Sequence, residues 1–427
     1  MLGAAALATL AAACGDVGTA QAAPRLTVLH SFVNPRGSTP VAGLIADGAG
    51  NLYGTTQLGG TNDKGVVFEL TPPAQGKRFW TESALHSFSG ADGDNPLAGL
   101  VADGAGNLYG TTYIGGANND GVVFELSPPA TGKTAWTEKV LHSFDGPNGK
   151  TPEAALIVDG AGNLYGTTVY GGNTYTGPNP GLGVVFELSP PAAGRKAWTE
   201  TVIHYFDITD GYYPEAGLIA DGAGNLYGTA IGGGNKGGYG VVFRLSPPAA
   251  GHPSWAETVL FSFDRTDGNA PLGGVIADGA GNLYGVTEHG GPYSPHHHGV
   301  QGVVYEISPP TAGKTVWTET VLKYFHGGDG HLPYGPLLED GAGNLYGTTS
   351  YGGATYGQGS PGDGEVYELS PPAAGQTAWT EKGLVSFSGP NGDNPLGGLI
   401  ADGAGNLYGT TVRGGTYGNG VVFRLTP

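Results

Sequence analysis

Two glutamates, Glu153 and Glu215, occupy equivalent positions in neighbouring repeats of the sequence. Each follows the proline that enters the first strand of its repeat, a position expected at the axial mouth of the molecule. Glycosidases use two carboxylates roughly 5 to 10 Å apart, so the pair is a candidate catalytic site of a carbohydrate-active hydrolase or lyase. Glutamate is also an ordinary exposed residue. The residues at this position are Val41, Leu97, Glu153, Glu215, Leu272, Tyr334 and Leu396.

Histidines form one local cluster, in the fifth repeat, where His289 precedes His296, His297 and His298. Imidazole is a common metal ligand, and His289, His296 and His298 are therefore candidate ligands. Consecutive side chains point in different directions, which argues against chelation of one ion by neighbours in sequence. Four other histidines share one fourth-strand position in different repeats. We expect these to lie on the surface, too far apart to share an ion: His30, His86, His142 and His204.

Tyrosines are frequent in the segments that differ most between repeats. Aromatic rings beside polar neighbours offer stacking area and hydrogen bonds, which suits a neutral polar ligand such as a glycan. The alternative is that these tyrosines belong to solvated loops that pack on one another. The candidate ligand-binding residues are Tyr170, Tyr175, Tyr212, Tyr213, Tyr293, Tyr334, Tyr351 and Tyr356.

These residues are carried by a sevenfold repeat. The segment Asp-Gly-Ala-Gly-Asn-Leu-Tyr-Gly recurs with its Asp at positions 47, 103, 159, 221, 278, 340 and 402. Four short strand candidates follow one another in each repeat, bounded by Gly, Pro, Asn and Asp. In the second repeat they are Ala98–Asp103, Leu108–Thr112, Val122–Ser127 and Thr137–Phe144. The sequence therefore predicts an all-β, seven-bladed β-propeller of four-stranded antiparallel blades.

The two ends of the chain are complementary. The chain stops after the third strand of the seventh repeat, and residues 26–32, LTVLHSF, resemble the fourth-strand phrase ALHSF at Ala84–Phe88. We expect this N-terminal strand to complete the last blade and close the ring, which removes an exposed edge.

Length variation is confined to one loop of each repeat. The separation from the repeat Asp to the Gly before the third strand is 18, 18, 24, 19, 24, 24 and 18 residues, whereas the other separations are constant. These second-to-third strand loops share a face with the connections between blades, and the opposite face carries the nearly invariant turns. Because binding residues concentrate on loops of a rigid scaffold, we expect a ligand on the variable face.

Composition excludes some classes of binding partner, and the N-terminal residues indicate the cellular compartment. The formal net charge is −18 and the 18 Lys and Arg residues are scattered, which argues against nucleic acid and anionic membranes. The apolar stretch after Met1 and the small residues Ala20-Gln21-Ala22 predict a signal peptide over residues 1–22 and a secreted or periplasmic propeller over 23–427. The alternative is a lipoprotein signal that ends before Cys14. No cofactor motif is found, no transmembrane segment is expected, and we expect a monomer that binds a glycan or an extracellular protein.

The phrases DGAGNLYGTT, GVVFELSPPA and WTETVLHSF resemble the repeats of the choice-of-anchor tandem repeat GloVer-containing proteins. The resemblance covers residues 26–427 and implies a bacterial exported protein without a defined activity. The phrase Asp-x-x-Gly-Asn-Leu-Tyr is more loosely similar to NHL-like propellers, which supports the fold. The sequence thus indicates a binding or scaffold module, with the hydrolase or lyase as the alternative.

Overall fold

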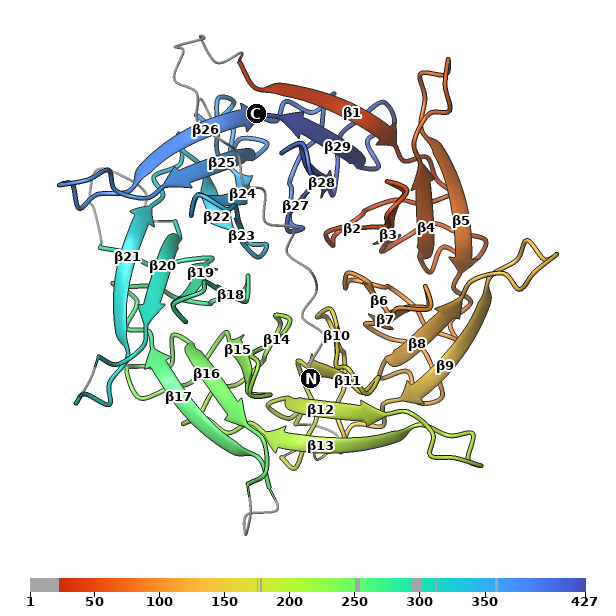
Figure 1. The fold of residues 1–427 in the computed structure, drawn as a ribbon, viewed down its shortest axis with the longest axis horizontal. Coiled ribbons are helices and arrows are strands. Elements are labelled where there is room, and N and C mark those ends of the chain that lie inside the picture. Colours follow the sequence, from red (N-terminus) through yellow and green to blue (C-terminus); the bar gives the residue numbers. More distant parts are fainter. Residues whose placement is uncertain are drawn as a thin grey trace.

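Seven antiparallel sheets stand in a ring in the computed structural model (Figure 1). The structure describes residues 23–174, 176, 179–249, 254–292, 301–311, 313–357 and 360–427. Within them the architecture is all-β, and no helix is long and apolar enough to cross a bilayer. The seven-bladed propeller is confirmed. The expected signal at residues 1–22, with Cys14, lies outside the described residues.

Blade 2 shows how each repeat folds. It consists of β6 (Val101–Ala102), β7 (Leu108–Thr112), β8 (Val122–Ser127) and β9 (Thr137–Ser143) in the order β6-β7-β8-β9. The expected second and third strands are confirmed residue by residue. The first strand is much shorter than the expected Ala98–Asp103, because residues 98–100 line the ring axis and only Val101 and Ala102 pair with β7.

The other blades repeat this plan. Blade 1 holds β2 (Ile45–Ala46), β3 (Leu52–Thr56), β4 (Val66–Thr71) and β5 (Thr81–Ser87); blade 3 holds β10 (Ile157–Val158), β11 (Leu164–Thr168), β12 (Val184–Ser189) and β13 (Thr199–Tyr205); blade 4 holds β14 (Ile219–Ala220), β15 (Leu226–Ala230), β16 (Val241–Ser246) and β17 (Ala256–Ser262). Blade 5 holds β18 (Val275–Ala277), β19 (Leu283–Thr287), β20 (Val303–Ser308) and β21 (Thr318–Tyr324); blade 6 holds β22 (His331–Pro333), β23 (Leu338–Glu339), β24 (Leu345–Tyr351), β25 (Glu365–Ser370) and β26 (Thr380–Ser386).

Blade 7 joins the two ends of the chain. It contains β27 (Ile400–Ala401), β28 (Leu407–Thr411) and β29 (Val421–Thr426), and its outer strand is β1 (Arg25–Ser31) (Figure 1). The register pairs Arg25 with Thr426 and Ser31 with Val421. The predicted closure by the N-terminal strand is confirmed, one residue earlier than expected.

The hydrophobic core lies between the blades. Val67 of blade 1 packs with Phe88, Leu108 and Phe124, which belong to blade 2 or to the segment leading into it. At the outer edge, Trp136 of blade 2 meets Tyr53 of blade 1 edge-to-face, with ring centroids 6.5 Å apart. The repeated aromatic and aliphatic residues therefore pack between the blades.

The Asp-Gly-Ala-Gly-Asn segment forms the first-to-second strand turn. Asp47 Oδ1 accepts hydrogen bonds from the backbone N–H groups of Ala49 and Asn51, both at 2.9 Å, and Oδ2 accepts from the Asn51 amide and the Tyr53 hydroxyl. Gly50 has φ of +83°, a conformation that favours glycine. The partners of both Asp47 carboxylate oxygens lie in the turn or in the strand β3 that follows it, which supports a structural role.

A β-bulge re-aims the fourth strands. In blade 1, Ala84 pairs with Phe68 and His86 pairs with Val67, so Leu85 is the additional residue. Side chains two residues apart normally share a face of a strand, and a bulge reverses this parity. Glu82 consequently faces the preceding blade, where it contacts His30, and His86 faces the following blade, near Glu138.

The expectation that these histidines lie on the surface is wrong. His30, His86 and His204 are half-buried between blades, with side chains only 14 to 19% exposed, and each contacts a carboxylate at 3.1 to 3.3 Å. Burial lowers the pKa of His86 and His142. The bulge is the physical reason, because simple strand alternation gives the wrong face.

Candidate functional site

The first strands of all seven blades converge on a cavity of about 390 Å³ on the ring axis. Its mouth on the variable face is lined by the residues that follow the entering prolines: Val41, Leu97, Glu153, Glu215, Leu272, Tyr334 and Leu396. The wall below is built from Ala and Gly because the blades approach closely there; a Cβ on Gly397 would lie 2.6 Å from the backbone carbonyl carbon of Ala42. The volume falls in the usual range of small-ligand pockets.

Glu153 and Glu215 share this cavity. Burial raises the pKa of Glu153 to about 7, and the negative charge of Glu215 adds to the effect. Burial likewise raises the pKa of Glu215 to about 7, with a contribution from Glu288. Near neutral pH each carboxyl group therefore exchanges between a proton donor and an acceptor, which suits either hydrogen bonding to hydroxyl groups or acid–base catalysis.

Tyr334 stands on the same wall. Its pKa is raised by burial and by the charges of Glu215, Glu153 and Glu288. The phenol therefore remains protonated and available as a hydrogen-bond donor near two groups that accept.

Three of the predicted tyrosines form an aromatic wall beside this acidic corner. The rings of Tyr170 and Tyr213 lie 5.0 Å apart, and those of Tyr212 and Tyr213 lie 4.9 Å apart, all edge-to-face. Burial raises the pKa of Tyr170, and the neighbouring tyrosines together with Glu153 and Glu215 raise it further, which ties the wall to the mouth. The structure thus brings together six of the predicted residues: Tyr170, Tyr212, Tyr213, Tyr334, Glu153 and Glu215.

Tyr351 and Tyr356 form a separate group on blade 6. Both pack against His331, with ring centroids 5.7 and 6.3 Å away. Tyr356 is 37% exposed. His289 contacts Glu288 at 3.3 Å and is exposed. The remaining predicted residues, Tyr175, Tyr293, His296 and His298, lie outside the described residues.

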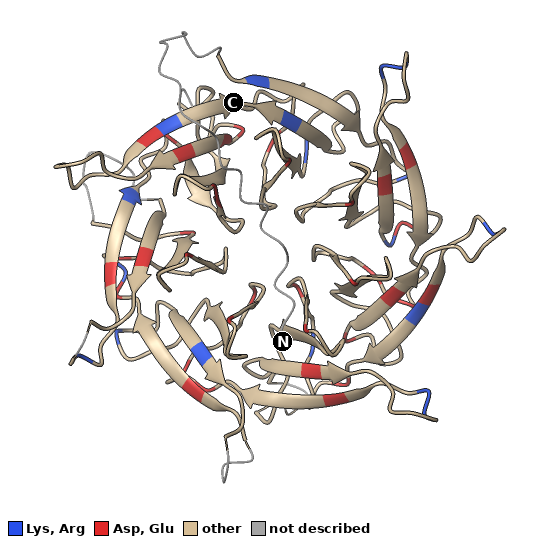
Figure 2. Ribbon diagram, viewed as in Figure 1, with Lys and Arg blue, Asp and Glu red and all other residues tan. Residues whose placement is uncertain are grey.

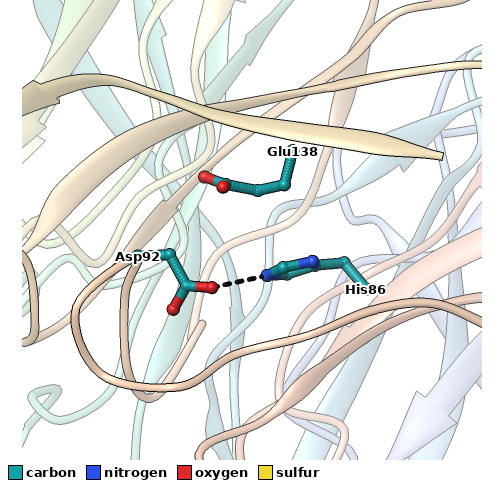
Figure 3. A group of neighbouring side chains, drawn as sticks. All are labelled: His86, Asp92 and Glu138. Carbon is teal, nitrogen blue, oxygen red and sulfur yellow. Dashed lines mark hydrogen bonds and ion pairs between the residues drawn. The ribbon is translucent and has the colours of Figure 1, made fainter.

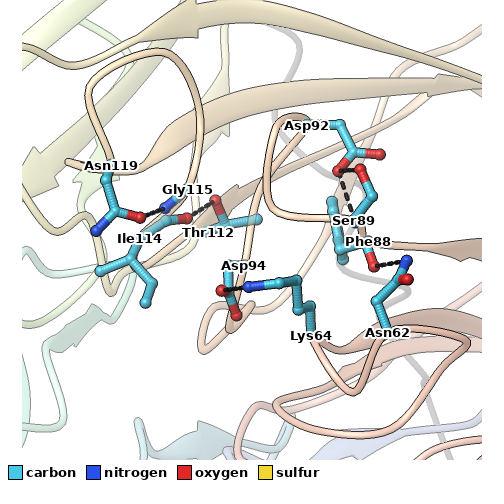
Figure 4. Close-up of polar contacts among 10 residues, drawn as sticks. All are labelled: Asn62, Lys64, Phe88, Ser89, Asp92, Asp94, Thr112, Ile114, Gly115 and Asn119. Carbon is cyan, nitrogen blue, oxygen red and sulfur yellow. Dashed lines mark hydrogen bonds and ion pairs between the residues drawn. The ribbon is translucent and has the colours of Figure 1, made fainter.

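Residues of the variable loops make defined contacts with the segment that enters the next blade. In blade 1 the loop residue Asn62 donates to the carbonyl of Phe88 at 3.2 Å, and Lys64 pairs with Asp94 at the entrance to blade 2 (Figure 4). One blade further on the same two positions carry the opposite charges, and Asp120 pairs with Lys150 at 2.8 Å. The face is therefore diversified in sequence on a constant frame.

A model of the Gloeobacter/Verrucomicrobia repeat family matches residues 14–193, 172–355 and 297–427. The chain belongs to this family. No curated protein matches it.

Solved structures similar to this Gloeobacter/Verrucomicrobia repeat protein include three at low identity. One is PorZ, a bacterial surface component of the type-IX secretion system of Porphyromonas gingivalis, with 13% identity and a TM-score of 0.49. The match covers 92% of this chain but only 47% of PorZ, so the chain spans about half of its length. The second is a luciferin-regenerating enzyme (15%, 0.43; 86% of this chain and 100% of that one). The third is a putative glucose dehydrogenase of Thermus thermophilus (14%, 0.42; 94% and 100%). Nothing about activity follows from likenesses this distant.

Two features of the repeat protein were not anticipated from its sequence. Glu288, which contributes to the raised pKa values of Glu215 and Tyr334, lies just after a second strand, at a position held by Gln57, Tyr113 and Val169 in the first three repeats. Aligning the repeats at that position would have found it.

The second unanticipated feature is a cavity of about 660 Å³ near the invariant turns of blades 3 and 4. Its lining includes Ile157, Ile219, Asp221 and Trp255. Residues of these types recur in most repeats, so this cavity does not account for the diversity of the other face.

Proposed function

We propose that this chain is an exported propeller that binds a glycan at the mouth of its axial cavity. One observation carries the proposal: Glu153, Glu215 and Tyr334 line one cavity, and the tyrosine wall of Tyr170 and Tyr213 adjoins it. Sugar rings present C–H faces that stack on aromatic rings and hydroxyl groups that bond to carboxyl and phenol oxygens.

The charge of the molecule supports a neutral ligand over a polyanion. The net charge is −18, the mouth carries two acidic groups, and Lys and Arg residues are scattered around the ring without a continuous basic band in the described residues (Figure 2). Nucleic acids and acidic polysaccharides would be repelled.

The test is a glycan array followed by calorimetry with the best ligand. We expect Tyr170→Ala and Tyr213→Ala each to weaken binding by at least about fivefold, which corresponds to the loss of a stacking ring worth about 1–3 kcal/mol by analogy with base stacking. Tyr417→Ala is the matched control, because Tyr417 is 59% exposed and belongs to blade 7, across the ring from blades 3 and 4 (Figure 1). Equal affinity of all four proteins would refute the site.

A hydrolase or lyase is the second candidate. The specific observation in its favour is that two carboxyl groups with pKa values raised to about 7 share one cavity. An enzyme of this kind predicts turnover of the bound glycan that falls by orders of magnitude in Glu153→Gln or Glu215→Gln. A binding module predicts no turnover by the unmodified protein, with both variants changing affinity only.

The export signal is part of the same proposal. We expect the N-terminus of the secreted protein, determined by mass spectrometry, at Ala23. A lipid-modified N-terminus at Cys14 would instead establish the anchored alternative.

A further inference from the structure

One position at the outer rim recurs at every junction between blades. Three residues meet there: one in a fourth strand, the residue six places later in the following loop, and one at the start of the next blade's fourth strand. We call this set of three residues a rim site. The rim site between blades 1 and 2 consists of His86, Asp92 and Glu138 (Figure 3). Its three ligand atoms, one nitrogen and two carboxylate oxygens, all lie within 4.8 Å of one another.

In two equivalent rim sites the two acidic residues are accompanied by a lysine ammonium. Between blades 5 and 6, Lys323 Nζ lies 2.5 Å from Asp329 Oδ2 and 3.4 Å from Glu381 Oε2. Between blades 4 and 5, where Phe261 takes the first position, the ammonium of Lys236 reaches Asp267 at 3.7 Å and stacks on the Phe261 ring.

One junction has neither a cation nor an acidic residue at these three positions. Between blades 6 and 7 the three positions are Val385, Asn391 and Leu26; Leu26 matches Glu82 because each pairs with the last leucine of the neighbouring third strand. The rim sites of His86 and His204 differ from these, because both acidic residues are present and an imidazole takes the first position, where Lys323 lies between blades 5 and 6.

The donor atoms at this rim site are already oriented. Asp92 Oδ1 accepts hydrogen bonds from the backbone N–H and the hydroxyl of Ser89, at 2.8 and 2.9 Å, which leaves Oδ2 facing His86 Nε2 at 3.1 Å. The His86 ring packs edge-to-face on Phe88 at 4.8 Å. Glu138 Oε1 is buried and makes no hydrogen bond among the described residues. Such supporting contacts are typical of the surroundings of metal ligands.

We propose that His86, Asp92 and Glu138 bind a divalent transition metal ion, with zinc as the best-suited probe. Zinc accepts imidazole nitrogen and carboxylate oxygen at about 2.0–2.2 Å, so neighbouring ligands of a tetrahedral site lie about 3.3 Å apart. The Nε2–Oδ2 distance already matches, and Glu138 closes the set with a small side-chain movement. The ion clamps blade 1 to blade 2, as Lys323 clamps blade 5 to blade 6.

The residues His204, Asp210 and Glu257 repeat the same composition between blades 3 and 4. Their His204 Nε2–Asp210 Oδ2 distance is 3.2 Å. Among the described residues, only the set at His86 brings three such atoms within 4.8 Å of one another. The test therefore counts the zinc lost on substitution at the His86 site rather than the total zinc bound.

The full chain, stripped of metal with a chelator, is titrated with zinc sulfate in a calorimeter and analysed for bound zinc after dialysis. We expect Asp92→Asn and Glu138→Gln each to remove one zinc per chain or to weaken it at least about tenfold, a lower bound set by the roughly 10- to 100-fold effects of supporting residues. Glu200→Gln is the matched control, because the rim site of Glu200 has Asn148 in place of an aspartate. We expect this substitution to leave the bound zinc and its affinity unchanged.

Two variants copy arrangements that the fold already contains, which guards against simple misfolding. Asp92→Asn reproduces the His142, Asn148 and Glu200 set, and His86→Lys reproduces the Lys323, Asp329 and Glu381 set. We expect His86→Lys to lose the zinc and to unfold at a temperature that no longer depends on zinc, whereas zinc raises that of the unmodified protein. The proposal would be overturned if both variants bound zinc with the stoichiometry and affinity of the unmodified protein. It would also be overturned if an equal concentration of magnesium displaced the zinc.

Discussion

Tyr213 combines a half-buried aromatic ring with a left-handed backbone conformation. Its φ is +57°, and the residue before the entering proline has a φ between +53° and +62° in all seven repeats: Thr39, Asn95, Thr151, Tyr213, Ala270, Leu332 and Asn394. Asparagine adopts this region at lower cost than a bulky residue. The fold therefore imposes this conformation whatever the side chain, and the asparagine of two other repeats is a natural replacement for Tyr213.

Replacing Tyr213 by asparagine should separate the role of the ring from that of the backbone conformation. Relief of backbone strain, about 1–2 kcal/mol, offsets the loss of ring contacts with Tyr170 and Tyr212, worth about 0.5–1.5 kcal/mol each. We expect the free energy of unfolding to change by less than about 1 kcal/mol, while glycan affinity falls as in Tyr213→Ala. Urea unfolding and calorimetry measure the two quantities, and a loss of several kcal/mol in stability would instead assign Tyr213 to the fold.

At the scale of the element, the loop before each third strand faces the entrance to the next blade through one residue pair. The pair is Lys64 with Asp94 at one junction and Asp120 with Lys150 at the next, both ionic. In blade 6 the equivalent residues are Asp363 and Asp393, which carry like charges. The pKa of Asp393 is raised by burial and then by Asp363, with Arg413 opposing.

Asp363→Lys should therefore stabilise the protein, since it copies the Lys64–Asp94 arrangement. We expect a gain of about 0.2–1 kcal/mol, the usual range for a partly exposed ion pair, and a smaller gain for Asp363→Asn, which removes repulsion only. The midpoints of urea unfolding at low and high salt check this, because the lysine variant's advantage must shrink as salt rises. If asparagine stabilises as much as lysine, no ion pair has formed.

What could be predicted from the sequence differs between elements. The second and third strands were predicted to the residue because Leu-Tyr-Gly-Thr-Thr and Val-Val-Phe-Glu-Leu are bounded by glycines or by turn segments. The first strand was overestimated, since its beginning lines the axis without a partner in its own blade. The rim site around His86 was missed because its three residues come from two blades and a bulge reverses which face His86 occupies.

On the scale of the whole molecule, half-buried glutamates should make stability fall as pH rises. Burial raises the pKa to about 7 for Glu138, Glu153, Glu200, Glu215, Glu257, Glu319 and Glu365. Between the unfolded value near 4.5 and about 7 the folded state holds more protons, so their loss on raising the pH favours unfolding. Lowered pKa values of His86, His142 and His331 act in the opposite direction but are fewer.

We therefore expect the temperature midpoint of unfolding to decrease as the pH is raised from about 5 to about 8. The double variant Glu153→Gln with Glu215→Gln should flatten this dependence, because amides do not ionise. Lys139→Gln is a control, since Lys139 is exposed. A midpoint that rises steadily over this range would show that the histidines outweigh the glutamates.

Closure of the ring depends on one strand from the far end of the chain. β1 supplies Leu26 and Val28 to the packing around blade 7, and Phe32, which follows it, is fully buried against Phe68 of blade 1 at 5.0 Å between ring centroids. Without residues 25–32, β29 would be an unpaired strand at the outer edge of blade 7, and the ring of seven blades could not close.

Deleting residues 25–32 should therefore cost more than the about 3–5 kcal/mol of one buried phenylalanine, and expose an edge that promotes aggregation. A synthetic peptide of residues 25–32 added in trans should restore the thermal midpoint by pairing with β29, as peptides add to open sheet edges. The same peptide with Phe32→Asp keeps every backbone hydrogen bond but loses the buried ring, so it should not restore the midpoint. Rescue by both peptides would mean that backbone pairing alone closes the ring, and rescue by neither, with an unchanged midpoint on deletion, would mean that the other six junctions hold the ring without it.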